Sequence, residues 1–477
     1  MRNFLAILDI GGSGIKLSCR SQDGKVSFTE RENLLPIYVN RSATQCPDKV
    51  FKLILQVLRK GGEKLASNDQ IEKIFISTLR QGFTLIRDKK ELTPLIYNSD
   101  STGSSAREEI SAYGMDKIYK ETGHWYAPQL TLPKLLHLKR EDSRLFEGDV
   151  SLAFFHDWVI WKLTGHKTSE ASLLASGQLW SLKNADIHYE LIDYFGFSRS
   201  LVGPLKFFGI NVDCINSKIV KDIGIPWRNC QVMVGGGDSH FLHYGASAQK
   251  SEAFVVSAGS STPISVLKED TGGLLDAQPW ISPTFQRKHY FVEGNLGYPG
   301  FYFNWLTEIY GGKEIKASTF NSSLVNRIPV VLASCQAWSQ ESWERRPPFA
   351  IVDLLSTHSS SDIALGLIID CAIGIKNQVN ALDHLKQREV IITGGGANAT
   401  LARLLATLAN RQVSINYSRE VALDAVVILE GHHLPREFET FEPEDDQILT
   451  NLLEFEALHE ESYSSALDLK ELIESVR

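Results

Sequence analysis

The sequence lacks several patterns that would assign its class directly, and each absence narrows the choice. Its six cysteines are scattered and form no Cys-x-x-Cys pair, so neither a disulfide framework nor a zinc site is expected. The longest apolar run, residues 365–375, contains Asp370 and is far too short to cross a bilayer. Asp9 and a glycine turn interrupt the apolar run that starts at Phe4, so we expect no signal peptide. These absences favour a cytoplasmic protein without a membrane partner.

Charge and length exclude further classes. The net charge is -8, and residues 436–477 alone hold 13 acidic and 3 basic residues, so the rest of the chain is nearly neutral. Nothing in this balance favours a nucleic-acid partner. The composition, 43% hydrophobic and 22% charged, is that of an ordinary globular protein. A chain of 477 residues is too long for one core, so two domains are expected.

The first glycine turn follows a predicted strand. Residues 4–10 and 15–19 read as strands, and Gly11, Gly12, Ser13 and Gly14 lie between them. Backbone amides of such a turn can bind phosphate oxygens, and Asp9 beside it can hold a magnesium-bound water. A plain hairpin with glycine at positive φ is the alternative. The P-loop spacing is absent.

A second hairpin of the same form occurs much later. Residues 254–258 and 262–266 read as strands around Gly259, Ser260 and Ser261. Two such hairpins suggest two related halves of the chain, with a boundary near residues 247–251.

Two more glycine runs follow predicted strands and precede predicted helices. After residues 232–234, three glycines lead to Asp238, which is either the N-cap of the helix or a general base for an attacking hydroxyl. His240 and His243 read as packing or surface residues of that helix. After residues 390–393, the run Gly394-Gly395-Gly396-Ala397-Asn398-Ala399 satisfies the dinucleotide fingerprint Gly-x-Gly-x-x-Ala, although the turn could equally support an adenosine.

The remaining pattern alternates helices and strands. Helices are predicted at residues 49–60, 133–139 and 154–163, the last with Gly165 as C-cap, and a strand at residues 73–77. Residues 448–476 predict terminal helices that pack by one apolar face.

In this order the motifs resemble the FGGY carbohydrate kinases of the hexokinase–actin–Hsp70 superfamily. The segments LDIGGSGIK, GGGDS, VSAGSST and ITGGGAN are similar to the first phosphate, catalytic-base, second phosphate and adenosine motifs. Thr122, Gly123, Pro128, Thr131 and the segment Pro133-Lys134-Leu135-Leu136 match the xylulokinase pattern with identical spacing. On the adenosine helix, Leu404 stands where the family usually has Gln. The resemblance covers about residues 4–430.

The resemblance implies a role for each matching residue. Asp238 would be the general base, and Asp9 and Asp238 would hold magnesium. The nucleotide and its phosphates would be bound by Gly11, Gly12, Ser13, Lys16, Gly259, Ser260, Ser261, Gly394, Gly395, Gly396 and Asn398. Sugar contacts would come from Arg80, Gln81, Tyr97, Asn98 and Asp238.

The implied fold is α/β: two actin-like, ribonuclease H-like domains with the active-site cleft between them. The expected limits are 1–247 for the sugar side, 248–435 for the adenosine side, and 436–477 for an acidic helical tail. The implied function is ATP- and Mg²⁺-dependent phosphorylation of a small sugar, such as a pentulose, or of a polyol. Two alternatives stay open: an NAD-dependent oxidoreductase using residues 394–399, and a non-catalytic sugar- or nucleotide-binding regulator. Either a monomer or a homodimer is compatible with the sequence.

Overall fold

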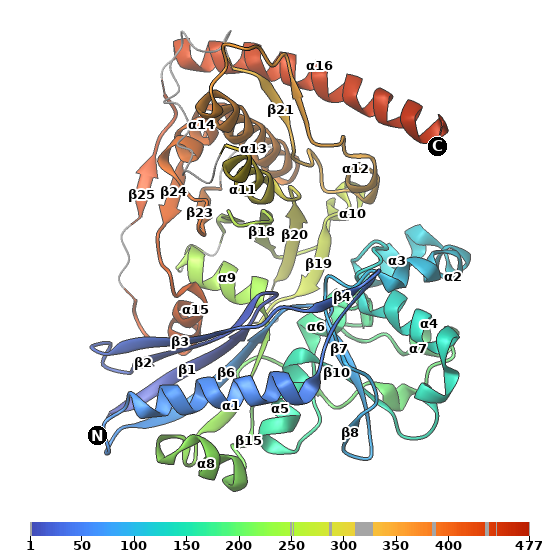
Figure 1. Ribbon diagram of the computed structural model, residues 1–477, viewed down its shortest axis with the longest axis vertical. Coiled ribbons are helices and arrows are strands. Elements are labelled where there is room, and N and C mark those ends of the chain that lie inside the picture. Colours follow the sequence, from blue (N-terminus) through green and yellow to red (C-terminus); the bar gives the residue numbers. More distant parts are fainter. Residues whose placement is uncertain are drawn as a thin grey trace. The chain divides into compact units, whose positions relative to one another are not determined.

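The chain forms two compact units (Figure 1). The computed structural model describes residues 2–248, 250, 252–285, 289–310, 328–383, 388–434, 438–444 and 446–476. Unit 1 comprises Met1–Gly245, Ile281–Phe291 and Glu420–Leu434, and unit 2 comprises Ala246–Trp280, Val292–Arg419 and Pro435–Arg477. Each unit therefore consists of more than one chain segment. The domain limits expected at 247/248 and 435/436 stay a prediction.

A six-stranded sheet forms the centre of unit 1. Its order is β15 (Asn211–Cys214), β16 (Gln231–Gly237), β6 (Gln70–Thr78), β1 (Asn3–Ile10), β2 (Gly14–Ser21) and β3 (Ser27–Asn33). β1 pairs parallel with β6, and β6 pairs parallel with β16. β1 and β2 form the antiparallel hairpin predicted from the glycine turn. The carboxyl ends of β1, β6 and β16 consequently lie along one edge of the sheet.

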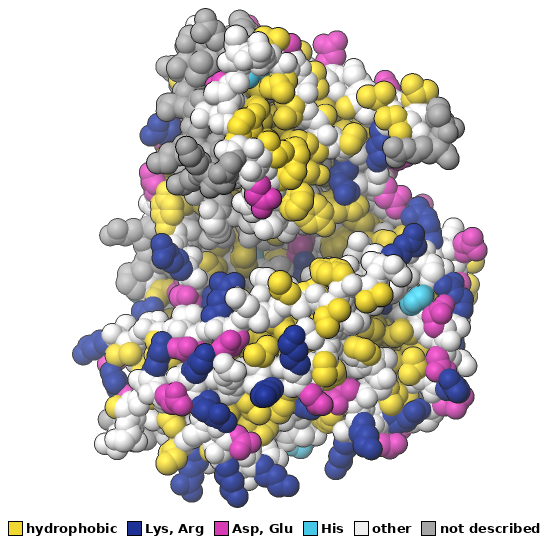
Figure 2. All heavy atoms as spheres, in the orientation of Figure 1, with side chains coloured by type: hydrophobic (Ala, Val, Ile, Leu, Met, Phe, Trp, Pro, Cys, Tyr) yellow, Lys and Arg dark blue, Asp and Glu magenta, His cyan; other side chains and the backbone are white. Residues whose placement is uncertain are grey.

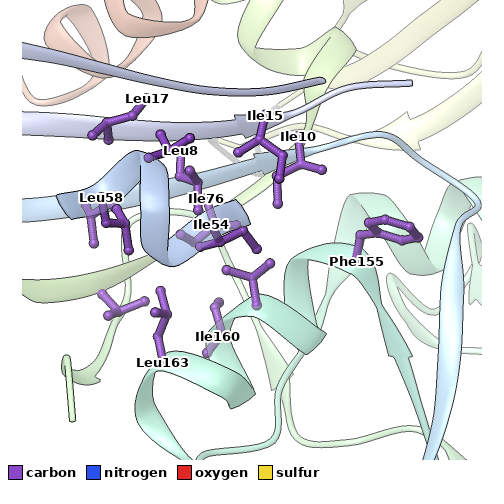
Figure 3. Packing of buried hydrophobic residues seen from close by; sticks show 14 of the residues in the cluster. Leu8, Ile10, Ile15, Leu17, Ile54, Leu58, Ile76, Phe155, Ile160 and Leu163 are labelled. Carbon is purple, nitrogen blue, oxygen red and sulfur yellow. The ribbon is translucent and has the colours of Figure 1, made fainter. Parts of the chain in front are cut away.

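Two helices cover this sheet with apolar side chains. α1 (Pro47–Glu63) packs on β2 and β3, and α5 (Phe155–Thr164) packs on β6 and β16. Figure 3 shows side chains of both helices meeting those of the strands in one cluster, among them Leu8, Leu17, Ile54, Leu58, Ile76, Ile160 and Leu163. Gly165 ends α5 in the left-handed conformation, as predicted. Fully buried strands of this kind read as continuous apolar runs, which is why β1 was recognisable in the sequence.

A second sheet and several short elements complete unit 1. The sheet has the order β10 (Ser151–Phe154), β7 (Phe83–Arg87), β9 (Leu95–Ile96), β5 (Ser42–Gln45) and β4 (Ile37–Val39), and β8 (Lys90–Glu91) pairs with β7. Two small pairs are β11 (Ser169–Glu170) with β14 (Leu205–Lys206), and β12 (Trp180–Ser181) with β13 (Asp186–Ile187). The further helices are α2 (Arg107–Tyr113), α3 (Met115–Thr122), α4 (Thr131–Glu141), α6 (Ala171–Ser176), α7 (Tyr189–Tyr194), α8 (Ser217–Ile223) and α15 (Val421–Leu429), with 3₁₀ turns at Thr102–Ala106, Ser143–Phe146, Arg199–Leu201 and Ile225–Trp227. Basic and acidic side chains intermix over the face of this unit seen in Figure 2.

The seven-stranded sheet repeats the strand order of the first sheet. Its order is β19 (Trp280–Pro283), β20 (Tyr290–Asn295), β18 (Pro263–Lys268), β17 (Phe254–Ser257), β23 (Val390–Thr393), β24 (Val413–Asn416) and β25 (Glu439–Phe441). β17 pairs antiparallel with β18 and parallel with β23, as β1 does with β2 and β6. The order β20-β18-β17-β23-β24 thus corresponds to β3-β2-β1-β6-β16. The two related halves inferred from the two hairpins are confirmed by this topology.

The helices of the second half include the acidic terminal segment. α9 (Asp238–Ser247) follows β16 and belongs to unit 1 up to Gly245. Unit 2 contains α10 (Leu274–Ala277), α11 (Pro299–Ile309), α12 (Gln340–Arg345), α13 (Ser360–Leu382) and α14 (Ala399–Ala409), with β21 (Val330–Leu332) paired to β22 (Ala350–Val352). Residues 448–476, predicted as several helices packed by one face, instead belong to one helix, α16 (Asp446–Val476). Leu452 and Phe455 are buried, whereas Leu458, Leu469 and Leu472 are exposed, so the apolar face of α16 is only partly buried. Further along the helix, Lys470 donates to the carbonyl of Glu344 (2.8 Å), and Glu471 accepts a hydrogen bond from Arg345. Within the described ranges, no helix is both long and apolar enough to span a membrane.

Candidate active site

Three predicted site residues lie at the shared edge of β1, β6 and β16. Asp9 is the second-to-last residue of β1, Arg80 follows β6, and Asp238 follows β16. Leu79 N–H donates to the carbonyl of Ile10 (2.7 Å), and Gly237 pairs with Thr78, so the strand ends are held in register. Parallel pairing therefore brings together residues that are more than 150 positions apart in the sequence. Ligands of open α/β sheets usually bind at this edge.

Arg80 and Asp238 face each other. Nε of Arg80 is 4.0 Å from Oδ1 of Asp238, and their side chains are 12% and 43% exposed. The Arg80 side chain passes over Gly237, where an added Cβ would lie 2.8 Å from Arg80 Cγ. Oδ1 of Asp238 also accepts the N–H of Ser239 (2.8 Å). The carboxylate is thus oriented by the start of α9 and remains accessible to a substrate.

His240 and His243 are buried packing residues, as the sequence predicted. The ring of His240 stacks between Phe285 and Phe291, and its Nε2 lies 3.2 Å from the carbonyl of Pro283. Burial, and then the charge of Arg80, lower the pKa of His240 well below its ordinary value. A neutral His240 bonded to a carbonyl must donate from Nε2, which leaves Nδ1 as an acceptor.

A buried polar network supports the glycine run before Asp238. Gly235 N–H donates to Nε2 of His156 (3.0 Å), so the proton of this ring is on Nδ1, which donates to Asp157 (3.0 Å). Gly237 N–H donates to Oγ of Ser172 (3.4 Å), and Ser172 donates to Glu170 (2.5 Å). These bonds fix the backbone that carries the candidate base.

The first phosphate turn is a hairpin with an open surface. Gly11 N–H donates to the carbonyl of Gly14 (3.0 Å), and a Cβ at Gly11 or Gly12 would have no neighbour within 4 Å. None of these three glycines has a positive φ, which corrects that part of the hairpin interpretation. In the part of the chain that the structure describes, the amides of Gly12 and Ser13 have no hydrogen-bond partner, so they are available to a ligand.

Asp9 and Lys16 are cross-strand neighbours beside this turn. Burial raises the pKa of Asp9, while the hydrogen bond from Ser77 Oγ (2.7 Å) and the charge of Lys16 act in the opposite direction. Lys16 Nζ lies 3.4 Å from Glu420, which also accepts a hydrogen bond from Ser18. Lys16 is therefore engaged with two acids, and its predicted phosphate contact stays a prediction.

The other two predicted nucleotide segments meet in unit 2. Gly396 N–H donates to the carbonyl of Ala258 (2.8 Å), and Ala258 N–H donates to the carbonyl of Thr393 (2.7 Å). This places the turn Gly259-Ser260-Ser261 next to the turn Gly394-Gly395-Gly396. Gly394 has φ +96°, and a Cβ there would lie 2.7 Å from the Ala258 carbonyl, so glycine is required.

Other predicted site residues have structural contacts of their own. Asn398 is the N-cap of α14, since its Oδ1 accepts the N–H of Leu401 (2.9 Å). Leu404, on the same helix, is buried. The ring of Tyr97 is fully buried against Phe155, whereas Asn98 is half-buried. The ligand contacts predicted for these residues stay predictions.

The comparisons with known proteins agree with this arrangement. Residues 4–245 match the N-terminal domain of the FGGY family of carbohydrate kinases. The chain belongs to that family. One relative is a Bacillus subtilis strain 168 protein that is named as a sugar kinase, YoaC. It is 26% identical over 470 residues, which are 94% of this chain and 95% of the relative. A xylulose kinase of Staphylococcus xylosus is 21% identical over 82% of each chain.

Solved structures show the same fold. A ligand-bound xylulose kinase from Lactobacillus acidophilus superposes with a TM-score of 0.83 at 17% identity, over 97% of this chain and 98% of the other. The predicted actin-like, two-domain α/β fold and the predicted class of enzyme, an FGGY carbohydrate kinase, are confirmed. Membership also supports the coarse function, ATP-dependent phosphorylation of a sugar, over the oxidoreductase and the non-catalytic regulator.

Sequence reasoning missed the buried residues that hold the backbone of the site in place. The network of His156, Glu170 and Ser172, and the buried Lys134, were not recognised as neighbours of the site. A charged residue on the otherwise apolar face of a predicted helix, as Lys134 is within residues 132–136, was the available signal. Its partners lie 37 and 53 positions away, which no local pattern reveals.

Proposed function

We propose that this FGGY kinase transfers the γ-phosphoryl group of ATP to a hydroxyl of a small ketose, such as a pentulose, or of a polyol, with Asp238 as the general base. The observation that carries the proposal is that Asp9, Arg80 and Asp238 lie at the ends of three neighbouring parallel strands, with Arg80 4.0 Å from Asp238 and Asp238 43% exposed. A base must reach the hydroxyl that it deprotonates.

In the proposed reaction, the carboxylate of Asp238 takes the proton of the attacking hydroxyl. The bond from the sugar oxygen to the γ-phosphorus forms as the bond to the β-phosphate oxygen breaks, and the products are a sugar phosphate and ADP. Arg80 beside Asp238 offers donors to the sugar hydroxyls. Positioning and charge stabilisation supply most of the rate enhancement in phosphoryl transfer.

The nucleotide is assigned to the glycine turns. Free amides of Gly12 and Ser13 support phosphate binding in unit 1, and Ser260 and Ser261 are their counterparts in the second hairpin. The turn Gly394-Gly395-Gly396 is exposed beside it and supports the adenosine.

The carboxylates fit magnesium. Mg²⁺ usually takes one or two protein carboxylates together with substrate phosphates and water. Asp9 and Asp238 offer such carboxylates, although within the described residues no group of three or more His, Cys, Asp or Glu could hold a metal. Bound with ATP, the ion would neutralise charge on the phosphates.

The test is release of ADP with a panel of ketoses, polyols and deoxy sugars. We expect at least one ketose or polyol to stimulate ADP release well above the rate without sugar, and magnesium to be required. Phosphate on the acceptor, identified by mass spectrometry, distinguishes transfer from ATP hydrolysis. No stimulation by any acceptor, or reduction of NAD with the same sugars, would contradict the proposal.

A further inference from the structure

Lys134 on α4 is a fully buried charged residue that the proposed mechanism does not use. It lies among Leu132, Leu135 and Leu136, which belong to the apolar core of unit 1. Its Nζ donates to the carbonyl of Gln81 (2.8 Å) and to the carbonyl of Tyr97 (2.9 Å). A lysine is seldom fully buried, because removing its ammonium from water is costly. Its presence here calls for a compensating role.

The two carbonyls are acceptors but not counter-ions. In the chain segments that the structure describes, Lys134 forms no ion pair within 4 Å, and Asp100 attracts it only from a distance. Asp100 is itself bonded to Ala43 N–H and to Thr102. Burial therefore dominates and lowers the pKa of Lys134 to about 7. An apolar residue would fill this position at less cost to stability.

The first carbonyl belongs to the loop that carries Arg80. Gln81 has φ +61°, a conformation that residues other than glycine adopt only when their surroundings hold them there. Its carbonyl accepts a bond from Lys134 and a second from Thr131 Oγ1 (3.1 Å), which is also on α4. These two bonds fix the turn after β6 and with it the path of Arg80 over Gly237 toward Asp238.

The second carbonyl belongs to the loop that carries Asn98. Tyr97 N–H bonds to Ala43, its ring packs on Phe155, and its carbonyl bonds to Lys134. One ammonium thus joins the two loops, after β6 and after β9, from which the sugar contacts are expected.

We propose that Lys134 is a positioning residue for the sugar: it holds the loop of Arg80 and Gln81 and the loop of Tyr97 and Asn98 in the spacing that binds the acceptor. This inference rests on the proposed function, which assigns the sugar to those loops. Lys134 is buried and acts on the sugar only through these two loops. Its loss should therefore weaken sugar binding and leave nucleotide binding unaffected.

The test compares Lys134→Met with Lys139→Met, using the best acceptor of the panel. Lys139 lies on the same helix and also donates to two carbonyls, those of Phe195 and Gly196, both at 2.7 Å. For Lys134→Met we expect the KM for the sugar to rise about 10-fold or more, with kcat within about 3-fold and the KM for ATP unchanged. Lys139→Met should keep the sugar KM of the wild type.

Thr131→Val is the second variant, since it removes one of the two side-chain bonds to the Gln81 carbonyl and keeps the lysine. We expect a rise in sugar KM of about 3-fold, and this variant decides the question if Lys134→Met does not fold. An unchanged sugar KM in a folded Lys134→Met would overturn the inference. If Lys134→Met does not fold, an unchanged sugar KM in Thr131→Val would overturn it. So would an equal rise in Lys139→Met.

The wild type and Asp238→Asn separate this outcome from failure of the proposed function. An active wild type, an inactive Asp238→Asn and an unchanged Lys134→Met would refute only the role of Lys134. A wild type that phosphorylates no acceptor would refute the proposed function, and the inference with it.

Discussion

Asp238 lies at the start of α9, where an Asp is often only a helix cap, yet its side chain is 43% exposed and its Oδ1 lies 4.0 Å from Nε of Arg80. If it is the base, Asp238→Asn should lower kcat by about 10²-fold or more, because an amide cannot accept the proton. The sugar KM should change much less. Asp193→Asn, at an exposed Asp paired with Arg199, is the matched control and should keep full activity. Turnover close to that of the control in a folded Asp238→Asn would show that Asp238 is not the base.

The environment of Asp9 also yields a prediction. Burial raises the pKa of Asp9, and the hydrogen bond from Ser77 lowers it. Magnesium needs the carboxylate form, so Ser77→Ala, which removes the opposing hydrogen bond, should raise the pKa of Asp9 further. The magnesium concentration for half-maximal activity should increase as the pH falls. This increase should begin at a higher pH in the variant than in the wild type. Asp9→Ala should need more magnesium at every pH and keep its affinity for sugar without nucleotide. Identical magnesium curves for Ser77→Ala and the wild type would exclude this coupling.

The buried ammonium of Lys134 should also make the stability of the protein depend on pH. Its pKa is lowered from 10.5 to about 7, so between these values the unfolded chain binds a proton that the folded protein does not. Stability from this group therefore rises with pH, by about 2 kcal/mol from pH 7 to pH 9. Lys134→Met should lack this increase, whereas Lys139→Met should keep it. Urea unfolding at both pH values measures the difference, and parallel pH profiles for wild type and Lys134→Met would contradict a buried, titrating lysine.

At the scale of elements, the strands and glycine turns were predictable from the sequence because each is a local pattern. β1 and β23 end where the sequence placed their ends, at Ile10 and Thr393, whereas β16 continues through the three glycines to Gly237. The packing of α16 was not predictable, because an apolar stripe does not show which of its residues meets a partner. Leu452 is fully buried, whereas Leu469, further along the same helix, is 55% exposed.

The candidate site also has a part that the sequence could predict and a part that it could not. Sequence order suggested Asp9, Arg80 and Asp238, and parallel pairing of β1, β6 and β16 explains why they meet. The sequence did not show that the ring of Tyr97 lies in the core, because a motif position does not show the direction of a side chain. Its predicted sugar contact stays a prediction. The bonds of Lys134 and of His156 join distant segments, so only the folded chain shows them.

The start of α11 supports the second phosphate turn, and this contact can be tested. An added Cβ at Gly300 would lie 2.1 Å from the carbonyl of Gly259, so Gly300→Ala must displace the turn. Alanine otherwise favours a helix over glycine by about 1 kcal/mol, so a loss of function would come from the contact. We expect the KM for ATP to rise about 10-fold and sugar binding without nucleotide to stay normal. Gly272→Ala, where the Cβ would meet only the side chain of Asp270, is the control; equal ATP kinetics in the two variants would show that the turn does not bind phosphate.

At the scale of the whole molecule, two sheets with the same strand order each carry a glycine turn after the first strand and a functional segment after a later parallel strand. In the first sheet that segment begins at Asp238, after β16, and in the second it is Gly394 to Asn398, after β23, which is the counterpart of β6. A carboxylate can act as a general base, whereas an exposed glycine turn leaves room for an adenosine. The proposed division of labour, sugar on unit 1 and adenosine on unit 2, thus follows from what each half has at the ends of its parallel strands.

This division predicts where each ligand slows hydrogen exchange. A ligand at 100 times its Kd stabilises the unit that binds it by about 2.7 kcal/mol, which slows exchange through opening of that unit roughly 100-fold. The acceptor sugar alone should protect residues 77–82, 97–98 and 235–240, while a non-hydrolysable ATP analogue with magnesium should protect residues 257–261 and 394–401. A sugar from the panel that is not phosphorylated is the control and should protect neither set. Stronger protection of residues 394–401 than of residues 77–82 by the acceptor sugar would reverse the assignment, because a ligand can stabilise directly only the segments that it contacts.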